Sequence, residues 1–313
     1  MDNLLTTDQV AKRLKVHSNT VFRWIKSGKL AATKVGSTYR IKESTLTAFI
    51  GDAIPAEERT RIIAVANQKG GVAKTTTAVN LTASLSSQGK KVLLIDLDPQ
   101  GGCAVCLGQD TSKLERTIYN VLVKPDVDIT NVVMETAYGF DLVPSNIDLA
   151  GAEVELKQML SQESILKRRL QGILDSYDFI IIDTPPSLGI LTVNALTAAH
   201  YVLIPVSCEY MALRGLKMLL DTIESVQKVT NPTLQILGIL ATKYDPRTLN
   251  SREVYDYLRD FGERHAIKFF NEAIKQSVRF MEAPNTGQPL VRLHPDLDGA
   301  KAYQLVAHEI LYG

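Results

Sequence analysis

The loop at residues 69–77, with the sequence KGGVAKTTT, constrains the fold of this chain more than any other stretch. Before it, residues 62–66 form an apolar, β-prone run, and after it residues 78–85 carry apolar side chains at helical spacing. The loop therefore joins a buried strand to the N-terminus of a helix. Free backbone N–H groups and the helix dipole both favour anions at such a position, so we predict a phosphate-binding loop.

The residue types in this loop suit a nucleoside triphosphate with Mg2+. Two glycines let backbone N–H groups turn toward phosphates, Lys74 supplies a cation, and Thr75 supplies a hydroxyl ligand for the metal. A glycine turn that binds no ligand is the alternative interpretation. The predicted nucleotide-binding residues of the loop are Lys69, Gly70, Gly71, Val72, Ala73, Lys74, Thr75 and Thr76.

The composition is that of a folded protein with one large and one small domain. The 313 residues are 45% hydrophobic and 22% charged, no stretch reaches the roughly 18 apolar residues of a membrane span, and the first residues lack a signal-peptide pattern. We expect a cytoplasmic protein without membrane contact. Cys103 and Cys106 have C-x-x-C spacing, but because no second pair exists we expect all three cysteines to be free thiols.

Charge is distributed unevenly along the chain, although the net charge is only +1. Residues 1–50 hold nine Lys and Arg against three Asp and Glu, whereas the remainder is mildly acidic. A small basic segment on an acidic body is typical of an appended nucleic-acid reader.

Residues 1–50 carry the pattern of two short helices followed by a hairpin. Thr7 is expected to cap the first helix, and the second begins near Ser18 after a short turn. The β-prone runs 32–35 and 38–41 flank a Gly-Ser turn and form the predicted hairpin, which acts as a wing. Leu46, Phe49 and Ile50 indicate a short closing helix.

This whole segment resembles the MerR/excisionase type of winged helix-turn-helix. Its second helix is expected to enter the major groove, with the wing on phosphates or in the minor groove. The alternative is a small domain that serves protein contacts. The predicted DNA-binding residues of the segment are Ser18, Asn19, Thr20, Arg23, Lys26, Lys34 and Arg40.

Residues 51–60 contain glycine, proline and a charged run, and we interpret them as a linker. From 61 to 313, apolar strands alternate with helical stretches. Such alternation predicts an α/β fold with a mostly parallel sheet, covered by helices on both faces, that binds its ligand at the carboxyl ends of the strands. The buried strands are expected at 62–66, 91–95, 179–182, 201–204 and 234–240.

Aspartates follow two of these strands. Asp96 and Asp98 come after the strand at 91–95, and Asp183 comes after the strand at 179–182. In P-loop enzymes a carboxylate at a strand tip holds Mg2+, directly or through water, while another group orients the attacking water. Helix capping is the alternative role for such aspartates.

Four motifs together resemble the ParA/Soj partition ATPases, members of the ParA/MinD group with a deviant Walker A loop. They are the loop at 69–76, DLDPQG at 96–101, DTPPSL at 183–188 and VRFMEAP at 278–284. The resemblance spans residues 61–313. It implies a P-loop ATPase that uses ATP and Mg2+, is slow, and is stimulated by DNA and by a ParB-like centromere-binding protein.

The resemblance also implies roles for individual residues. Lys74 and Thr75 would contact the β- and γ-phosphates and Mg2+, Asp96 and Asp183 would serve the metal, and Asp98 would position the hydrolytic water. Thr75, Asp96 and Asp183 are therefore the predicted metal residues.

Lys69 has a separate implied role, because it would reach across a dimer interface to the phosphates of the partner subunit. A cation placed in trans where charge accumulates acts like an arginine finger. ATP would then join two subunits, and hydrolysis would weaken the homodimer. Lys69 and Asp98 are the predicted catalytic residues.

The chain departs from the family pattern in the loop and on the adenine side. Ala73 stands where glycine is usual, which costs about 1 kcal/mol if its φ is positive. Lys275 and Ser277, predicted as nucleotide-binding positions, replace the proline and asparagine of the family. Arg279 matches the family arginine that binds DNA without sequence preference, with an ordinary surface ion pair as the alternative.

These observations predict a DNA-binding ATPase of the ParA class that dimerises with ATP and positions a plasmid, chromosome region or other cargo. It is expected to be nucleoid-associated, with sequence-specific DNA binding through residues 1–50. A transcriptional repressor or autorepressor that uses ATP as a co-ligand with little turnover is the alternative, which Ala73 favours. A MinD-like membrane-site selector is disfavoured because the C-terminal stretch 302–311 is short and not basic.

Overall fold

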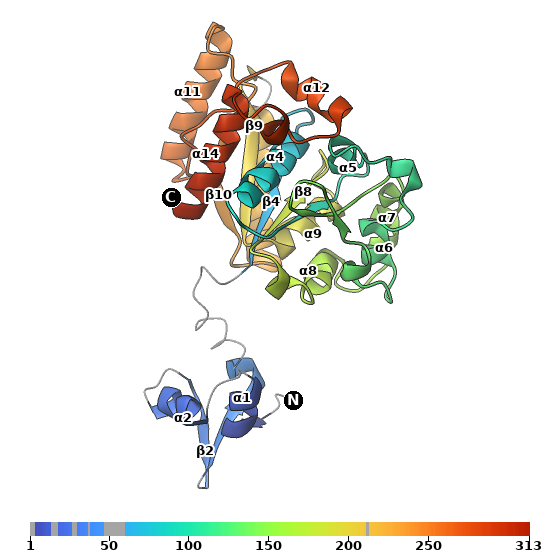
Figure 1. Cartoon of the computed structure of the whole chain (residues 1–313). Coiled ribbons are helices and arrows are strands. Elements are labelled where there is room, and N and C mark those ends of the chain that lie inside the picture. The colour runs from blue at the N-terminus through green and yellow to red at the C-terminus, as the bar shows by residue number, and fades with distance from the viewer. Residues whose placement is uncertain (1–3, 14–17, 27–29, 37, 47–59, 211–212) are drawn as a thin grey trace. The chain divides into compact units, whose positions relative to one another are not determined.

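The structure is a computed structural model that describes residues 4–13, 18–26, 30–36, 38–46, 60–210 and 213–313 (Figure 1). Contacts divide it into two compact units, Met1–Arg59 and Thr60–Gly313.

The first unit is a small helix-turn-helix with an antiparallel sheet of order β1-β3-β2. The buried side chains of Val10, Val21 and Ile41 join helices and sheet into one core. The strand β1, which the sequence did not predict, pairs with β3. Its elements are β1 (Leu4–Thr6), α1 (Thr7–Arg13), α2 (Ser18–Lys26), β2 (Thr33–Val35) and β3 (Thr38–Lys42).

The cap of α1 differs from the prediction. Thr6, and not Thr7, caps the N-terminus of α1. Gln9 N donates to Thr6 Oγ1 (3.1 Å) and Thr6 N donates to Gln9 Oε1 (2.8 Å), which is a capping box. Thr7 is the first helical residue. Of the predicted closing helix, residues 43–46 are helical, and Phe49 and Ile50 lie outside the described residues.

The second unit confirms the predicted α/β class. Its seven-stranded sheet has the order β10-β9-β4-β8-β5-β7-β6, and all neighbouring strands are parallel except the pair β6 and β7. The strands are β4 (Arg61–Val65), β5 (Val92–Asp96), β6 (Met134–Glu135), β7 (Asp141–Val143), β8 (Phe179–Asp183), β9 (Tyr201–Ser207) and β10 (Gln235–Thr242).

Successive side chains of the central strands point to opposite faces, and each face is covered by helices (Figure 1). One face carries α4 (Lys74–Ser87), α5 (Gly102–Cys106), α12 (Arg279–Thr286), α13 (Leu290–Leu293) and α14 (Asp298–Tyr312). The other carries α6 (Ile118–Val123), α7 (Leu149–Leu156), α8 (Ile165–Leu170), α9 (Ile190–Ala198), α10 (Leu213–Val229) and α11 (Leu249–Arg264).

Short 3-10 turns connect several of these elements. They are η2 (Thr111–Lys113), η3 (Ile129–Asn131), η4 (Gln162–Ser164) and η5 (Leu174–Ser176). Among the described residues, no helix combines the length and the apolar character needed to cross a membrane.

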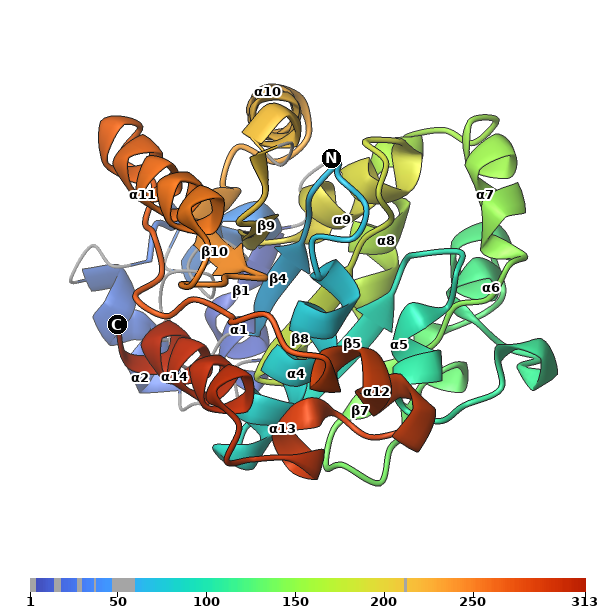
Figure 2. The same ribbon diagram turned by 90° about the horizontal axis from the view of Figure 1, so that it is seen from above.

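The parallel strands bring their carboxyl ends to one edge of the sheet, which faces the viewer in Figure 2. There β5 and β8 pair so that Asp96 lies opposite Asp183. The loop between β4 and α4 lies beside them. This edge therefore holds the residues that the sequence singled out.

Candidate nucleotide and metal site

The loop that precedes α4 turns through two residues in the left-handed region. Gly71 has φ 71°, and Ala73, the residue before the helix, has φ 68° and ψ 33°. Glycine adopts this conformation freely, but the Cβ of an alanine is strained there by about 1 kcal/mol. The φ of Ala73 is therefore positive, and the backbone strain that the sequence analysis gives for that case applies.

Lys74 is folded back into the loop. Its Nζ donates to the carbonyl oxygen of Lys69 over 3.2 Å, and the residue is only 6% exposed. Burial lowers the pKa of its ammonium group, and the carboxylates of Asp183 and Asp98 oppose that effect. Thr242 Oγ1 donates to the carbonyl oxygen of Val72 (3.0 Å) and holds the loop against the end of β10.

Thr75 and Asp183 are in direct contact. Thr75 Oγ1 donates to Asp183 Oδ2 over 2.6 Å, and Asp183 is fully buried. Burial raises the pKa of Asp183 to about 7, against the hydrogen bond from Thr75 and the charge of Lys74. Asp183 Oδ1 is buried and has no hydrogen-bond partner among the residues that the structure describes. A buried carboxylate oxygen left unpaired beside a hydroxyl fits a hard cation such as Mg2+ or its water ligand.

Asp96 faces the same space from β5. Its two oxygens accept from the backbone N–H groups of Asp98 and Cys103, each over 2.9 Å. Burial, and then the nearby charge of Asp183, raise its pKa well above the usual value. Its oxygens are therefore held by backbone donors, which orient the start of α5 against the strand end.

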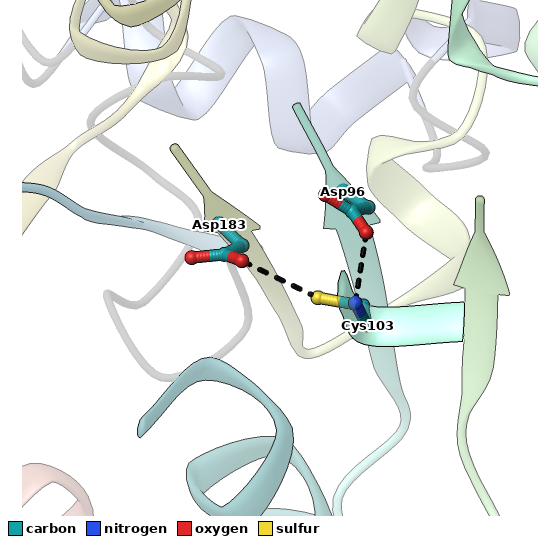
Figure 3. A group of neighbouring side chains, drawn as sticks. All are labelled: Asp96, Cys103 and Asp183. Atoms are coloured by element: carbon teal, nitrogen blue, oxygen red, sulfur yellow. Dashed lines mark hydrogen bonds between the residues drawn. The ribbon is translucent and has the colours of Figure 1, made fainter. Parts of the chain in front are cut away.

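Cys103 completes this group, which the sequence did not predict (Figure 3). Its Sγ donates to Asp183 Oδ2 at 3.6 Å, and ligand atoms of Asp96, Cys103 and Asp183 all lie within 4.8 Å of one another. Burial and the two carboxylates raise the pKa of the thiol well above its usual value, so it acts as a neutral donor. All three cysteines of the chain are free.

Asp98 lies just beyond Asp96 and is half-buried. Its Oδ1 accepts from Gln100 N over 3.0 Å. Asp98 N donates to Asp96 Oδ1, and Asp96 lies opposite Asp183. The charge of Asp98 contributes to the raised pKa of Asp183. A carboxylate that is partly open to solvent beside the phosphate loop is suitably placed to orient a water molecule.

The side chain of Lys69 forms an ion pair within its own chain. Its Nζ lies 3.0 Å from Glu209 Oε2, while its backbone N donates to Asn67 Oδ1 over 3.0 Å. The hydrogen bond from Lys69 is the largest cause that lowers the pKa of Glu209. The sequence did not predict Glu209 as the partner of Lys69.

A cavity of about 690 Å³ lies beside the loop. Lys275 and Ser277 line it together with Gly71, Ala73 and Thr76. Lys275 Nζ forms an ion pair with Asp298 Oδ2 at 2.8 Å. The two positions that the sequence placed on the adenine side thus border a space of nucleotide size next to the phosphate loop.

Arg279 is the second residue after Ser277 and the first of α12. Its guanidinium contacts Glu282 Oε2 at 2.8 Å, and both side chains are more than half exposed. The ion pair given as the alternative for Arg279 therefore exists, but solvent exposure leaves the cation accessible to a phosphate.

The predicted DNA contacts of the first unit are divided between α2 and the wing. Lys26 and Lys34 are exposed. Arg40 donates to Thr38 Oγ1 and to a backbone carbonyl, and Ser18 Oγ donates to Asp8 Oδ1 over 2.7 Å. The side chains of Asn19, Thr20 and Arg23 lie outside what the structure describes.

The fold and the loop define a P-loop nucleotide-binding protein with an added helix-turn-helix unit. Comparison with protein families agrees: a model described as an AAA domain matches residues 60–236, and a helix-turn-helix domain matches residues 4–52. The sporulation initiation inhibitor protein Soj of Bacillus subtilis is 46% identical over 255 residues, covering 80% of this chain and 98% of Soj. The chromosome partitioning protein ParA of Caulobacter vibrioides is 41% identical over 254 residues, covering 80% of this chain and 94% of ParA. The chain therefore belongs to the Soj/ParA family of AAA-type ATPases.

Solved structures give the same result. One named cobyrinic acid a,c-diamide synthase from Mycobacterium smegmatis, with bound ADP and magnesium, is 44% identical with a TM-score of 0.71, covering 80% of this chain and 94% of that chain. The apo form of McdA from Cyanothece is 27% identical with a TM-score of 0.72, covering 80% of this chain and 99% of that chain. The resemblance to the ParA group that the motifs indicated is thereby confirmed.

Proposed function

We propose that this protein is a DNA-binding ATPase of the ParA class that dimerises with ATP and positions a plasmid, chromosome region or other cargo. The observation that carries the proposal is the pair Thr75–Asp183, with the unpaired buried oxygen of Asp183 beside a buried Lys74. This is the donor set that Mg2+ with a triphosphate requires. Relatives named for chromosome partitioning, and similar structures solved with ADP or an ATP analogue and magnesium, support the same assignment.

ATP and Mg2+ would be held by the residues around this pair. Lys74 would bind the β- and γ-phosphates, Thr75 and Asp183 would hold the metal with Asp96 behind them, and Asp98 would orient the attacking water. Bound Mg2+ would neutralise charge that develops on the phosphates. The adenine would lie in the 690 Å³ cavity.

Dimerisation would be driven by Lys69. In the free chain this lysine pairs with Glu209, and we propose that it exchanges Glu209 for the phosphates of ATP in a second copy. Loss of the γ-phosphate would then weaken the dimer.

DNA would be bound in two ways. We assign sequence-specific binding to a domain at residues 1–50, joined by a linker at 51–60, and non-specific binding to Arg279 in the ATPase domain at 61–313. Dimerisation would bring two DNA-binding domains together, and these would fit two half-sites of an operator. Because ATP controls dimerisation, the bound nucleotide would then set the affinity for the operator. Operator footprints in ADP and in ATP test that coupling, and identical affinities would remove it.

The cellular setting follows from this activity. We propose a cytoplasmic, nucleoid-associated protein whose slow turnover is stimulated by DNA and by a ParB-like centromere-binding protein. The similarity to a chromosome partitioning protein, ParA of Caulobacter vibrioides, supports an association with the chromosome.

Nucleotide binding can be measured with a fluorescent ATP analogue, with and without Mg2+, on the intact chain and on Thr75→Ala. The proposal predicts binding that Mg2+ tightens in the parent and does not tighten in the variant. A parent chain that binds ATP equally with and without Mg2+ would contradict it.

A second candidate is a transcriptional regulator in which ATP is a co-ligand that is hardly turned over. The left-handed conformation of Ala73 favours it, because strain at this position opposes the geometry of the loop. Release of phosphate with saturating ATP and duplex DNA distinguishes the two. ATP binding without measurable release would support the regulator.

A further inference from the structure

The short helix α5 connects the metal site to α12, the helix that begins with Arg279 (Figures 1 and 2). At its first turn, α5 is tied to the strand ends: Cys103 N donates to Asp96 and Cys103 Sγ donates to Asp183. Gly102 also lies against Thr75, since a Cβ at Gly102 would come within 3.0 Å of Thr75 Cγ2. The first turn of α5 is therefore in direct contact with Thr75, Asp96 and Asp183.

The other end of α5 touches the segment that follows α12. Gly108 and Gly287 approach backbone to backbone: a Cβ on Gly287 would lie 2.8 Å from Gly108 Cα, and a Cβ on Gly108 would lie 3.2 Å from Gly287 Cα. Both residues have positive φ, 74° and 68°. A Cβ on Gly287 would therefore clash with the backbone at Gly108, whereas a Cβ on Gly108 would be tight and, at its positive φ, strained. The two backbones are in close contact here.

A hydrogen bond fixes Gly287 in this position. Tyr138 Oη donates to the carbonyl oxygen of Gly287 over 2.6 Å, and Arg292 in turn donates to the carbonyl oxygen of Tyr138. The end of α12 is thus held against α5 from one side and by Tyr138 from the other.

The first turn of α12 has its own connection to the phosphate loop. The ring of Phe280 packs edge-on against Tyr303 at 6.0 Å between centroids, and Tyr303 bonds to Thr77 of α4 over 3.0 Å. Both ends of α12 therefore rest on elements that bear residues of the nucleotide site.

We propose that Gly108 and Gly287 are positioning residues, through which occupation of the Thr75–Asp183 site sets the placement of α12 and thereby the affinity of Arg279 for DNA. This inference rests on the proposed DNA contact of Arg279. When Thr75 and Asp183 give up their mutual bond to hold other ligands, α5 moves with them, and the glycine contact passes the movement to α12. Packed backbone contacts of this kind carry coupling between two sites when the connected element has two arrangements.

The test compares the full chain with Gly287→Ala, Gly108→Ala and a matched control, Gly89→Ala. Gly89 also has a positive φ, 81°, but a Cβ there meets nothing within 4 Å, so the control carries the backbone strain without the clash. For each protein, affinity for a duplex of arbitrary sequence is measured without nucleotide and with a non-hydrolysable ATP analogue and Mg2+. Nucleotide affinity and light scattering are measured in parallel.

We expect the parent and Gly89→Ala to gain about tenfold or more in DNA affinity with the analogue, within the usual range of allosteric coupling. Gly287→Ala and Gly108→Ala should bind nucleotide and dimerise like the parent but lose most of that gain. An undiminished gain in both variants would overturn the inference, as would a loss fully explained by lost nucleotide binding. If either variant fails to fold, Tyr138→Phe, which removes one hydrogen bond without backbone strain, must show the reduced gain.

Arg279→Ala separates this inference from the proposed function. If that variant keeps the analogue-dependent DNA binding, the DNA contact itself is wrong. If it loses that binding while Gly287→Ala retains it, the contact stands and the glycine connection is overturned.

Discussion

Lys69 Nζ lies 3.0 Å from Glu209 Oε2, so the lysine that we assign to the phosphates of a second copy is neutralised within its own chain. The side chain of Glu209 is 52% exposed, and ion pairs in such surroundings contribute only about 0–1 kcal/mol. The pair is therefore easily exchanged. A triphosphate carries more negative charge than one carboxylate and can displace Glu209.

Replacing Lys69 with alanine should give a chain that binds ATP as a monomer, because no cation is left to contact the partner's phosphates. Light scattering with ATP and Mg2+ measures the change. Glu209→Gln is the control: it breaks the same ion pair but keeps the cation, so it should still dimerise. Lys69→Ala dimers that form with ATP as in the parent would refute the trans contact.

Ala73→Gly should stabilise the protein by about 1 kcal/mol, because glycine relieves the strain at φ 68°. Urea unfolding of the nucleotide-free protein gives the value. Ala266→Gly, at φ 52° and far from the loop in sequence, is the matched control and should stabilise similarly. Ala73→Gly alone should also tighten ATP binding, and equal nucleotide affinities in the parent and Ala73→Gly would exclude a functional effect of the strain.

The free energy of unfolding should fall as pH rises toward 7 when nucleotide and metal are absent. Asp183 has a pKa of about 7 in the folded chain and an ordinary value of 3.8. Between these two pH values Asp183 is protonated in the native state and ionised in the unfolded state. The free energy of unfolding therefore falls by about 1.4 kcal/mol for each pH unit because of this group. The stabilising effect is complete below the ordinary pKa and is lost as pH rises through the native one.

Urea unfolding at pH 5 and pH 7.5 tests this slope. Asp183→Asn, which cannot titrate, should lose less stability over the interval than the parent, although Asp96 still contributes in both. Equal slopes in the two proteins would show that Asp183 is ionised in the folded state at pH 5.

Arg279→Ala should weaken binding to duplex DNA and reduce the slope of log affinity against log salt by about 0.9, the value for one phosphate contact. Arg259→Ala is a close control. Arg259 pairs with Asp256 three residues away and is 51% exposed, much as Arg279 pairs with Glu282 and is 55% exposed. If both variants lose affinity alike, only net charge matters and Arg279 has no special contact.

The sequence was enough to predict the strand ends and the loop, because parallel strands must bring their carboxyl ends to one edge. Asp96 and Asp183 therefore meet as expected, and Thr75 joins them. The two-residue strand β6 and the three-residue strand β7 were missed, since such short runs show no periodicity.

Other features depend on tertiary structure. Glu209 is 140 residues from Lys69, and nothing in either segment indicates the pairing. The sequence predicts Cys103 only as a free thiol, because its Sγ lies beside Asp183 only in the folded chain. The sign of φ at Ala73 could not be predicted, because the residue type alone does not determine the backbone conformation of an alanine in a loop. The approach of Gly108 to Gly287 likewise exists only in the folded chain.

Light scattering combined with the ATPase rate, with and without duplex DNA, on the intact chain and on Asp98→Ala tests whether ATP joins two copies of this chain and is then hydrolysed. We expect dimers that form with ATP, slow turnover in the parent that DNA stimulates, and dimers that persist in Asp98→Ala because the attacking water is no longer oriented. A monomer, or a fixed dimer, that is indifferent to ATP would show that this protein is not an ATP-dependent dimerising ATPase.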